Sequence, residues 1–136
     1  MEHKDLATLA VKAREHSYAP YSNFCVGAAL LAENGEVYTG CNIENAAYSP
    51  TNCAERTAIF NAISQGVRKF EAIAVAGWPQ GGSPSAAFPC GVCRQVLMEF
   101  VQPDTFTVLV CTDEHNFTCH TLASLLPQGF GPASLS

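Results

Sequence analysis

The sequence predicts one α/β domain in which helices pack against a β-sheet as a layered sandwich. Three observations support this fold class. Apolar residues recur at helical spacing in some segments and form short continuous runs in others, and the two kinds alternate. Asn34-Gly35 separates two strand-like runs, which is a strong hairpin signal. No repeat or long linker divides residues 1–136, and alternating elements favour a layered α/β architecture.

The first part of the chain predicts a helix and then a β-hairpin. Apolar residues at helical spacing indicate a helix over residues 4–18, which the turn around Pro20 ends. The apolar run over residues 24–32 is typical of a buried strand, and residues 36–41 form the returning strand. A polar, turn-rich loop is expected to follow over residues 42–52.

The remaining elements are predicted from the same signals. Helical spacing begins again at Cys53, and Gly66 marks a helix stop. Residues 77–89 carry three Gly and three Pro, so we expect a loop there. Thr121 is expected to cap a short last helix. The other predictions are strands over residues 70–76, 105–111 and 116–119, and a helix over residues 91–101 with Val92, Val96, Leu97 and Phe100 facing inward.

Charge and composition exclude several classes of protein. Seven Lys and Arg against twelve Asp and Glu give a net charge of −5, which disfavours nucleic acid as a partner because phosphate binding needs a basic face. Residues 1–5 lack the layout of a signal peptide, and no apolar run approaches a membrane span. We therefore expect a cytoplasmic protein whose seven cysteines stay reduced.

Three cysteines have the spacing of a metal site. Cys53 opens one predicted helix, and Cys90 and Cys93 form a C-x-x-C motif at the start of another. The N-terminus of a helix stabilises a thiolate, which is the form that binds metals. Three protein ligands leave one position open for water, as in catalytic zinc sites. Glu55, two residues after Cys53, is placed to act there as a general acid and base.

Each motif also has a simpler interpretation. Asn52 and Glu55 match the spacing of a helix capping box. The C-G-x-C motif of Cys90 and Cys93 also occurs in redox dithiols. A redox site has no use for the Cys53-x-Glu55 motif, so the combination favours a metal centre.

The two motifs together resemble a known family. Cys53-Ala54-Glu55 and Pro89-Cys90-Gly91-Val92-Cys93 are similar to the H-x-E and P-C-x-x-C signature of zinc-dependent deaminases, with Cys in place of His. This variant resembles the homotetrameric cytidine deaminases. The resemblance extends over nearly the whole chain, and its further blocks are Val26–Leu30, Gly40–Ala46, Cys53–Ala58 and Pro89–Val96.

The resemblance implies a fold and an activity. The fold would be a three-layer α-β-α sandwich with a mixed central sheet. The activity would be hydrolytic deamination of cytidine and 2′-deoxycytidine, with one Zn²⁺ per chain activating water and Glu55 as proton shuttle. A homotetramer with shared active sites is also implied. The alternatives are a deaminase of another small aminopyrimidine compound and a non-catalytic zinc-binding module.

The resemblance also implies roles for further residues. Phe24 would pack on the base, and backbone groups of Ala54 and Cys90 would hold the base edge. Asn42 and Glu44 would bind the ribose. Ala46, Tyr48 and Phe130 would lie at subunit boundaries, and Arg56 would donate hydrogen bonds to the ligand thiolates. Arg94, which follows Cys93 in sequence, would either assist Arg56 or be an ordinary solvated helix arginine.

Overall fold

A mixed sheet of five strands forms the centre of the protein. The computed structural model describes residues 1–135. The strands are β1 (Phe24–Ala32), β2 (Val37–Cys41), β3 (Phe70–Pro79), β4 (Thr107–Cys111) and β5 (Phe117–Thr121). Their order across the sheet is β2-β1-β3-β4-β5. Only β3 and β4 pair in parallel, and the other neighbouring strands are antiparallel.

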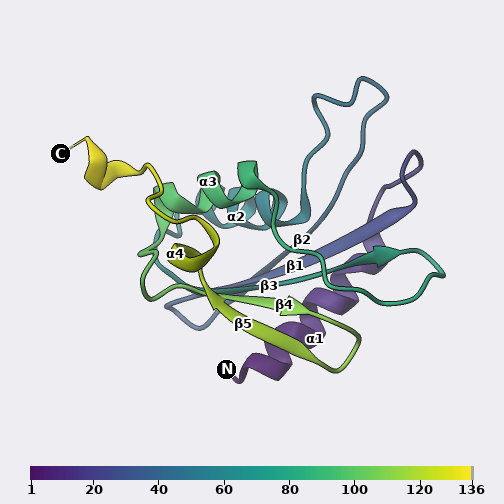
Figure 1. The fold of residues 1–136 in the computed structure, drawn as a ribbon, viewed down its shortest axis with the longest axis horizontal. Coiled ribbons are helices and arrows are strands. Elements are labelled where there is room, and N and C mark those ends of the chain that lie inside the picture. The colour runs from purple at the N-terminus through teal and green to yellow at the C-terminus, as the bar shows by residue number, and fades with distance from the viewer. Residues whose placement is uncertain (136) are drawn as a thin grey trace.

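Helices cover both faces of this sheet. They are α1 (His3–Ala13), α2 (Ala54–Ser64), α3 (Gly91–Phe100) and the short α4 (Leu122–Leu125). Helix α1 lies on one face, and α2 and α3 lie side by side on the other (Figure 1). The order of elements and the three-layer α-β-α sandwich predicted from the sequence are therefore confirmed.

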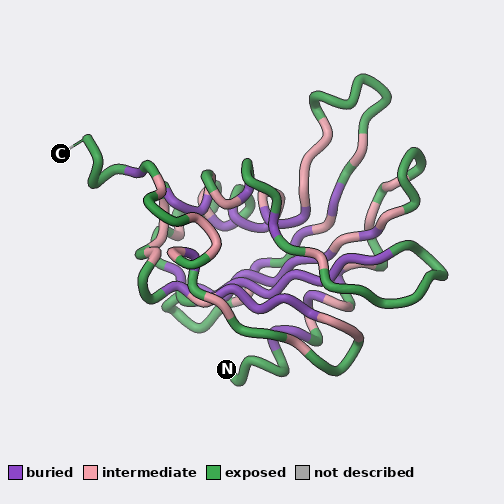
Figure 2. The backbone as a smooth tube through the Cα atoms, in the orientation of Figure 1, coloured by how far each residue is buried: buried purple, intermediate pink, exposed green. Residues whose placement is uncertain are grey.

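The strands bury side chains on both faces because each face has a helical layer. Leu6 and Ala10 of α1 share a core with Ala29 and Leu109 of the sheet. On the opposite face, a second core contains Ile59 of α2, Leu97 of α3 and Leu30, Ile73 and Val108 of the strands. Figure 2 shows the central strands β1, β3 and β4 buried along most of their length, whereas the edge strand β5 and most connecting loops are half-buried or exposed.

Two glycines allow helices to approach the sheet closely. A Cβ atom on Gly27 of β1 would lie 2.1 Å from the carbonyl oxygen of Ala10 in α1. A Cβ atom on Gly40 of β2 would lie 2.5 Å from the carbonyl oxygen of Ala54 in α2. Real atoms cannot approach so closely, so Gly40 allows the first turn of α2 to lie directly on the sheet.

The predicted first helix and central loop are corrected by the structure. The helix ends at Ala13 and continues as one 3₁₀ turn, Arg14–His16, instead of reaching residue 18. Strand β3 continues to Pro79, so Gly77–Pro79 belong to the sheet and only the residues after them form a loop. Pairing with Phe24–Val26 of β1 extends the strand, which is a tertiary effect.

Trp78 gains a structural role from this extension. Its side chain is buried, and the guanidinium of Arg14 lies 4.1 Å from the centre of its ring. Arg14 also donates to the carbonyl oxygen of Trp78 at 2.8 Å. The contact joins the end of α1 to β3 through a cation–π interaction.

Smaller corrections concern the C-terminal half. Val92 is 57% exposed and does not face inward, because the first turn of α3 buries Cys93 instead. The last strand covers Phe117–Thr121 and lies slightly later than predicted. Thr121 caps α4 as expected, since its side chain accepts a hydrogen bond from the backbone N–H of Ser124 at 3.1 Å. No helix within residues 1–135 is long and apolar enough to cross a membrane.

Candidate active site

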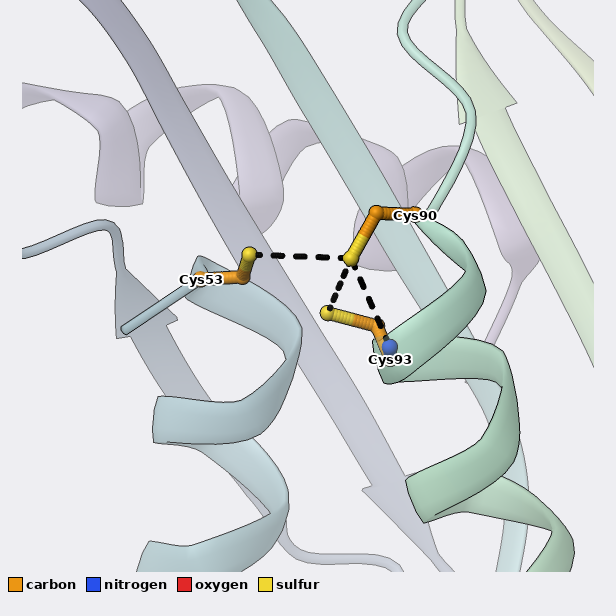
Figure 3. A group of neighbouring side chains, drawn as sticks. All are labelled: Cys53, Cys90 and Cys93. Carbon is orange, nitrogen blue, oxygen red and sulfur yellow. Dashed lines mark hydrogen bonds between the residues drawn. The ribbon is translucent and has the colours of Figure 1, made fainter. Parts of the chain in front are cut away.

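Three sulfur atoms converge where α2 and α3 begin. Cys53 and Cys90 precede the first residues of the two helices, and Cys93 lies in the first turn of α3. The Sγ atoms of Cys53 and Cys90 are 3.8 Å apart, and those of Cys90 and Cys93 are 3.4 Å apart. Figure 3 shows the three side chains pointing toward one another. These separations exceed the roughly 2.05 Å of a disulfide bond, and all three cysteines are free.

The two helix starts explain why these sulfurs lie together. Cys53 and Cys90 have extended backbones, with ψ of 157° and 166°, so their side chains project from the open ends of the helices. The unpaired N–H groups there favour negative charge. The backbone N–H of Cys93 donates to the Cys90 sulfur at 3.5 Å. Both helices lie on the same face of the sheet, which brings the two open ends together (Figure 1).

The sulfur cluster fits a zinc ion. Four thiolates at about 2.3 Å around tetrahedral zinc lie about 3.8 Å apart, close to the separations of 3.8 and 3.4 Å found here. Within residues 1–135, these cysteines are the only group of three or more His, Cys, Asp or Glu residues placed to hold a metal. Three ligands leave a fourth tetrahedral position free, which is typical of catalytic zinc.

Arg56 partly compensates the charge of the cluster. Its Nη2 atom donates a hydrogen bond to Cys53 Sγ at 3.2 Å, as expected for a cation close to the ligands. The hydrogen bond from Cys93 and the neighbouring Arg56 lower the pKa of Cys53 to about 5. The same Cys53–Cys93 hydrogen bond, with burial, raises the pKa of Cys93. One thiol is thus ready to ionise, and a metal would displace the proton retained by the other.

Glu55 is buried beside the cluster. Its side chain is 4% exposed and lines a cavity of about 180 Å³ together with Cys53 and Cys90. Burial is the main reason that the pKa of Glu55 rises to about 7. A carboxyl group that titrates near neutrality can both accept and donate a proton at physiological pH.

The capping-box interpretation of Glu55 is wrong. Helix α2 is capped at Cys53 instead of Asn52. The side-chain amide of Asn52 donates to Thr57 Oγ1 at 3.0 Å. Glu55 therefore lies in the first turn of the helix, where it faces the cavity.

The cavity contains some of the residues expected to bind substrate. Phe24, Asn42 and Ala54 line it. Asn42 also holds the start of β1, because its Oδ1 accepts from the Val26 N–H at 2.9 Å and its Nδ2 donates to the Phe24 carbonyl at 2.8 Å. Six further residues line the cavity without having been predicted from the sequence: Val26, Thr51, Asn52, Val75, Ala87 and Phe88.

Glu44 lines a second, neighbouring cavity of about 390 Å³. Its carboxylate accepts hydrogen bonds from the backbone N–H groups of Tyr21 and Ser22 and from the Ser22 hydroxyl. The Ser22 hydroxyl is the main cause that lowers the pKa of Glu44. Tyr48 lines the same cavity, with its ring edge-on to Tyr21 at 6.1 Å. Thr51 lines both cavities, so the two adjoin.

Besides Cys93 and Arg56 of the sulfur cluster, three of the expected residues line neither cavity. Ala46 is exposed in the loop after β2. Phe130 is 58% exposed, and its carbonyl accepts a hydrogen bond from Gln95. Arg94 donates to the carbonyl oxygens of Pro89 and Leu125 at 2.7 and 2.5 Å. It thus joins the residue before Cys90 to the end of α4, and these hydrogen bonds go to backbone oxygens instead of the ligand thiolates.

The sulfur cluster and the cavity define a metal-dependent enzyme of the α/β class, and the comparisons with known proteins specify which one. The family described as "Cytidine and deoxycytidylate deaminase zinc-binding region" matches residues 1–109. The cytidine deaminase of Sporosarcina psychrophila is 49% identical over 136 residues, which cover 100% of this chain and 96% of that protein. The cytidine deaminase of Halalkalibacterium halodurans is 46% identical over 130 residues, or 96% of this chain and 95% of that protein.

A solved structure agrees with these sequence matches. The cytidine deaminase from Burkholderia pseudomallei superposes with a TM-score of 0.86 and 46% identity, covering 96% of this chain and 100% of that one. The chain belongs to the cytidine and deoxycytidylate deaminase zinc-binding family.

Proposed function

We propose that this protein hydrolyses cytidine and 2′-deoxycytidine to uridine and 2′-deoxyuridine with release of ammonia. The observation that carries the proposal is the buried Glu55 carboxyl group in the cavity that Cys53 and Cys90 also line. This arrangement supplies a proton carrier next to a metal-binding corner. The family membership and the relatives that carry the name cytidine deaminase support the substrate class.

The sulfurs of Cys53, Cys90 and Cys93 would hold the zinc ion. Zinc supplies a Lewis acid, which lowers the pKa of water to near neutrality and so provides a nucleophile. Glu55 accepts one proton from the attacking water and delivers it to N3 of the pyrimidine. It then accepts the proton of the hydroxyl group now bonded to C4 and passes it to the departing amine, so that both water protons are accounted for. A pKa near 7 suits this carboxyl group to both directions of transfer.

The two adjoining cavities suit the two halves of a nucleoside. The smaller one is lined by Phe24 and Ala54, which would contact the face and the edge of the base. In the larger one, the Glu44 carboxylate would accept a hydrogen bond from a ribose hydroxyl. Asn42 lines the base cavity and retains one amide N–H for the sugar beyond its two backbone bonds.

Cytidine turnover tests the proposal directly. Purified zinc-loaded protein is expected to lower the near-ultraviolet absorbance of cytidine and to release one ammonia per uridine formed. Loss of ammonia from another aminopyrimidine alone would indicate a deaminase of different substrate range. Absence of turnover on all of them, with zinc bound, would leave a non-catalytic zinc-binding module.

We further propose a homotetramer whose subunits share active sites. Two segments extend from the sandwich: the loop between β2 and α2, and the C-terminal segment after α4 (Figure 1). They carry Tyr48 and Phe130, which are 70% and 58% exposed. Large aromatic rings so exposed favour burial against another chain. Reduced thiols are needed for zinc binding, so we also propose a cytoplasmic location.

Complementation tests the shared sites. Variants Glu55→Gln and Phe130→Ala, each expected to have low activity, should recover part of it when mixed and reassembled. Analytical ultracentrifugation should give four times the monomer mass of 14.5 kDa. A fully active monomer would contradict this proposal.

A further inference from the structure

The loop between β3 and α3 forms one wall of the smaller cavity. Ala87, Phe88 and Cys90 from this loop line the cavity. Ala54 and Glu55 line the same cavity from the start of α2. Phe88 lines the cavity and is also 47% exposed, so its ring lies at the mouth. The proposed mechanism gives Phe88 no role.

The position of Phe88 is fixed from outside the cavity. Its ring packs edge-on against the ring of His120 on β5, with 5.2 Å between centroids and 64° between planes. The Nε2 atom of His120 lies 2.8 Å from Thr118 Oγ1 on the same strand. An edge-to-face pair of this kind favours one relative orientation of the rings. The sheet edge therefore supports the mouth of the cavity.

The residues on either side of Phe88 are also held. Pro89 is fully buried, and Arg94 donates to its carbonyl oxygen at 2.7 Å. A Cβ atom on Gly77 would lie 2.9 Å from the Ala87 methyl group and 3.1 Å from the Phe24 ring. The missing side chain of Gly77 thus lets the loop and Phe24 approach each other. The residues on either side of Phe88 are therefore held in place by these contacts.

The proposed reaction orients the base relative to this wall, and the inference rests on that proposed function. Carbon C4 must lie at the sulfur cluster, with N3 on the side of Glu55. In a pyrimidine ring, C5 is bonded to C4 on the side away from N3. The chain that leads into Cys90 runs away from α2 (Figure 3), and Ala87 and Phe88 of this segment line the cavity. A substituent on C5 would therefore point toward Phe88.

We propose that Phe88, positioned by His120, determines which C5 substituents the site accepts. Cytidine, with hydrogen at C5, fits beside the ring. A 5-methyl group needs the space that Phe88 occupies, and the contacts of the loop on both sides oppose its displacement. The site should therefore discriminate against 5-methylated cytosine nucleosides.

The test compares cytidine with 5-methylcytidine on the zinc-loaded enzyme. Phe88→Ala should raise the ratio of kcat/KM for 5-methylcytidine over cytidine about tenfold, the discrimination that one methyl group in an apolar pocket typically gives. Phe88→Leu, which retains an apolar side chain, should give a smaller rise. A ratio within twofold of the unchanged protein in both variants would overturn the proposal.

Further variants separate the contact between His120 and Phe88 from a general loosening of β5. His120→Ala should shift the ratio in the same direction as Phe88→Ala, and His120→Phe should restore it because an aromatic edge contact remains. Phe117→Ala is a matched control: Phe117 pairs edge-on with His3 at 6.4 Å on the same strand, away from the cavity. This control should leave the ratio unchanged. A shift equal to that of His120→Ala would make the effect a general consequence of loosening β5 and would contradict the proposal.

Failure of this inference is distinguishable from failure of the proposed function. If the unchanged protein deaminates cytidine but its variants keep the same substrate ratio, the Phe88 inference alone is wrong. If the unchanged zinc-loaded protein deaminates neither substrate, the proposed function is wrong, and the inference falls with it.

Discussion

The guanidinium of Arg56 donates a hydrogen bond from Nη2 to the sulfur of Cys53 over 3.2 Å. Three thiolates around Zn²⁺ carry a net charge of −1, which weakens the ion as a Lewis acid. A hydrogen bond from a cation withdraws charge from one ligand and offsets part of this weakening. Arg56, the residue after Glu55, is therefore placed to strengthen the proposed zinc ion as a Lewis acid.

Arg56→Gln should weaken zinc binding or turnover by about tenfold to a hundredfold, the usual effect of removing a partner of a metal ligand. Competition with a chromogenic chelator and the kcat for cytidine measure the two quantities. Arg68→Gln is the matched control, because exposed Arg68 donates to the carbonyl oxygens of Ile63 and Val67 and, within residues 1–135, to no sulfur. Equal behaviour of the two variants would show that the Arg56–Cys53 bond has no electrostatic role.

Glu55→Gln should retain zinc but lower kcat by at least about a hundredfold, because the amide cannot carry the proton. Metal analysis and cytidine turnover on the same preparation separate the two effects. Glu71→Gln removes an exposed carboxylate of β3 outside this cavity and should leave kcat unchanged. A Glu55→Gln enzyme of full activity would rule out the proton-shuttle role.

Gly40→Ala should destabilise the protein by at least about 1–3 kcal/mol, the usual cost of overpacking. The added Cβ would lie 2.5 Å from both the Ala54 carbonyl oxygen and the Ala58 N–H nitrogen, so α2 must move away from β2. Urea unfolding measures the loss. Thr39→Ala, at an exposed neighbouring position of β2, is the control and should change stability little. If Gly40→Ala were as stable as this control, the close packing of α2 on β2 would be refuted.

Removal of zinc should lower the melting temperature. A ligand at 100 times its Kd stabilises the folded state by about 2.7 kcal/mol, which corresponds to roughly 10 °C for a domain of this size. Differential scanning calorimetry with and without a chelator measures the shift. The Cys53→Ser variant should show a much smaller shift, since it lacks one thiolate. A shift of the same size in that variant would place the stabilising metal elsewhere.

Much of the fold could be predicted because its signals are local. The Asn34-Gly35 turn, the Gly66 helix stop and the Thr121 cap act within a few residues, and all are found. Extension of β3 to Pro79 could not be predicted, because it depends on pairing with distant Phe24–Val26. The outward position of Val92 follows from the inward position of Cys93, which helical spacing alone does not set.

The candidate site shows the same division between local and distant information. Cys53, Glu55 and the C-x-x-C motif of Cys90 and Cys93 are recognisable in sequence because their spacing at helix starts carries the chemistry. Phe88 had one available signal, its position two residues before Cys90. Its contact with His120, 32 positions later in the sequence, becomes visible only when β5 is placed beside the loop.

We expect Cys53, Cys90 and Cys93 together to bind one zinc ion and to leave one position for water. X-ray absorption at the zinc edge of the purified protein tests it most directly. The spectrum should show one zinc per chain with three sulfur ligands at about 2.3 Å and one oxygen ligand at about 2.0 Å. A centre with four sulfur ligands, or with nitrogen in place of any of the three sulfurs, would contradict it.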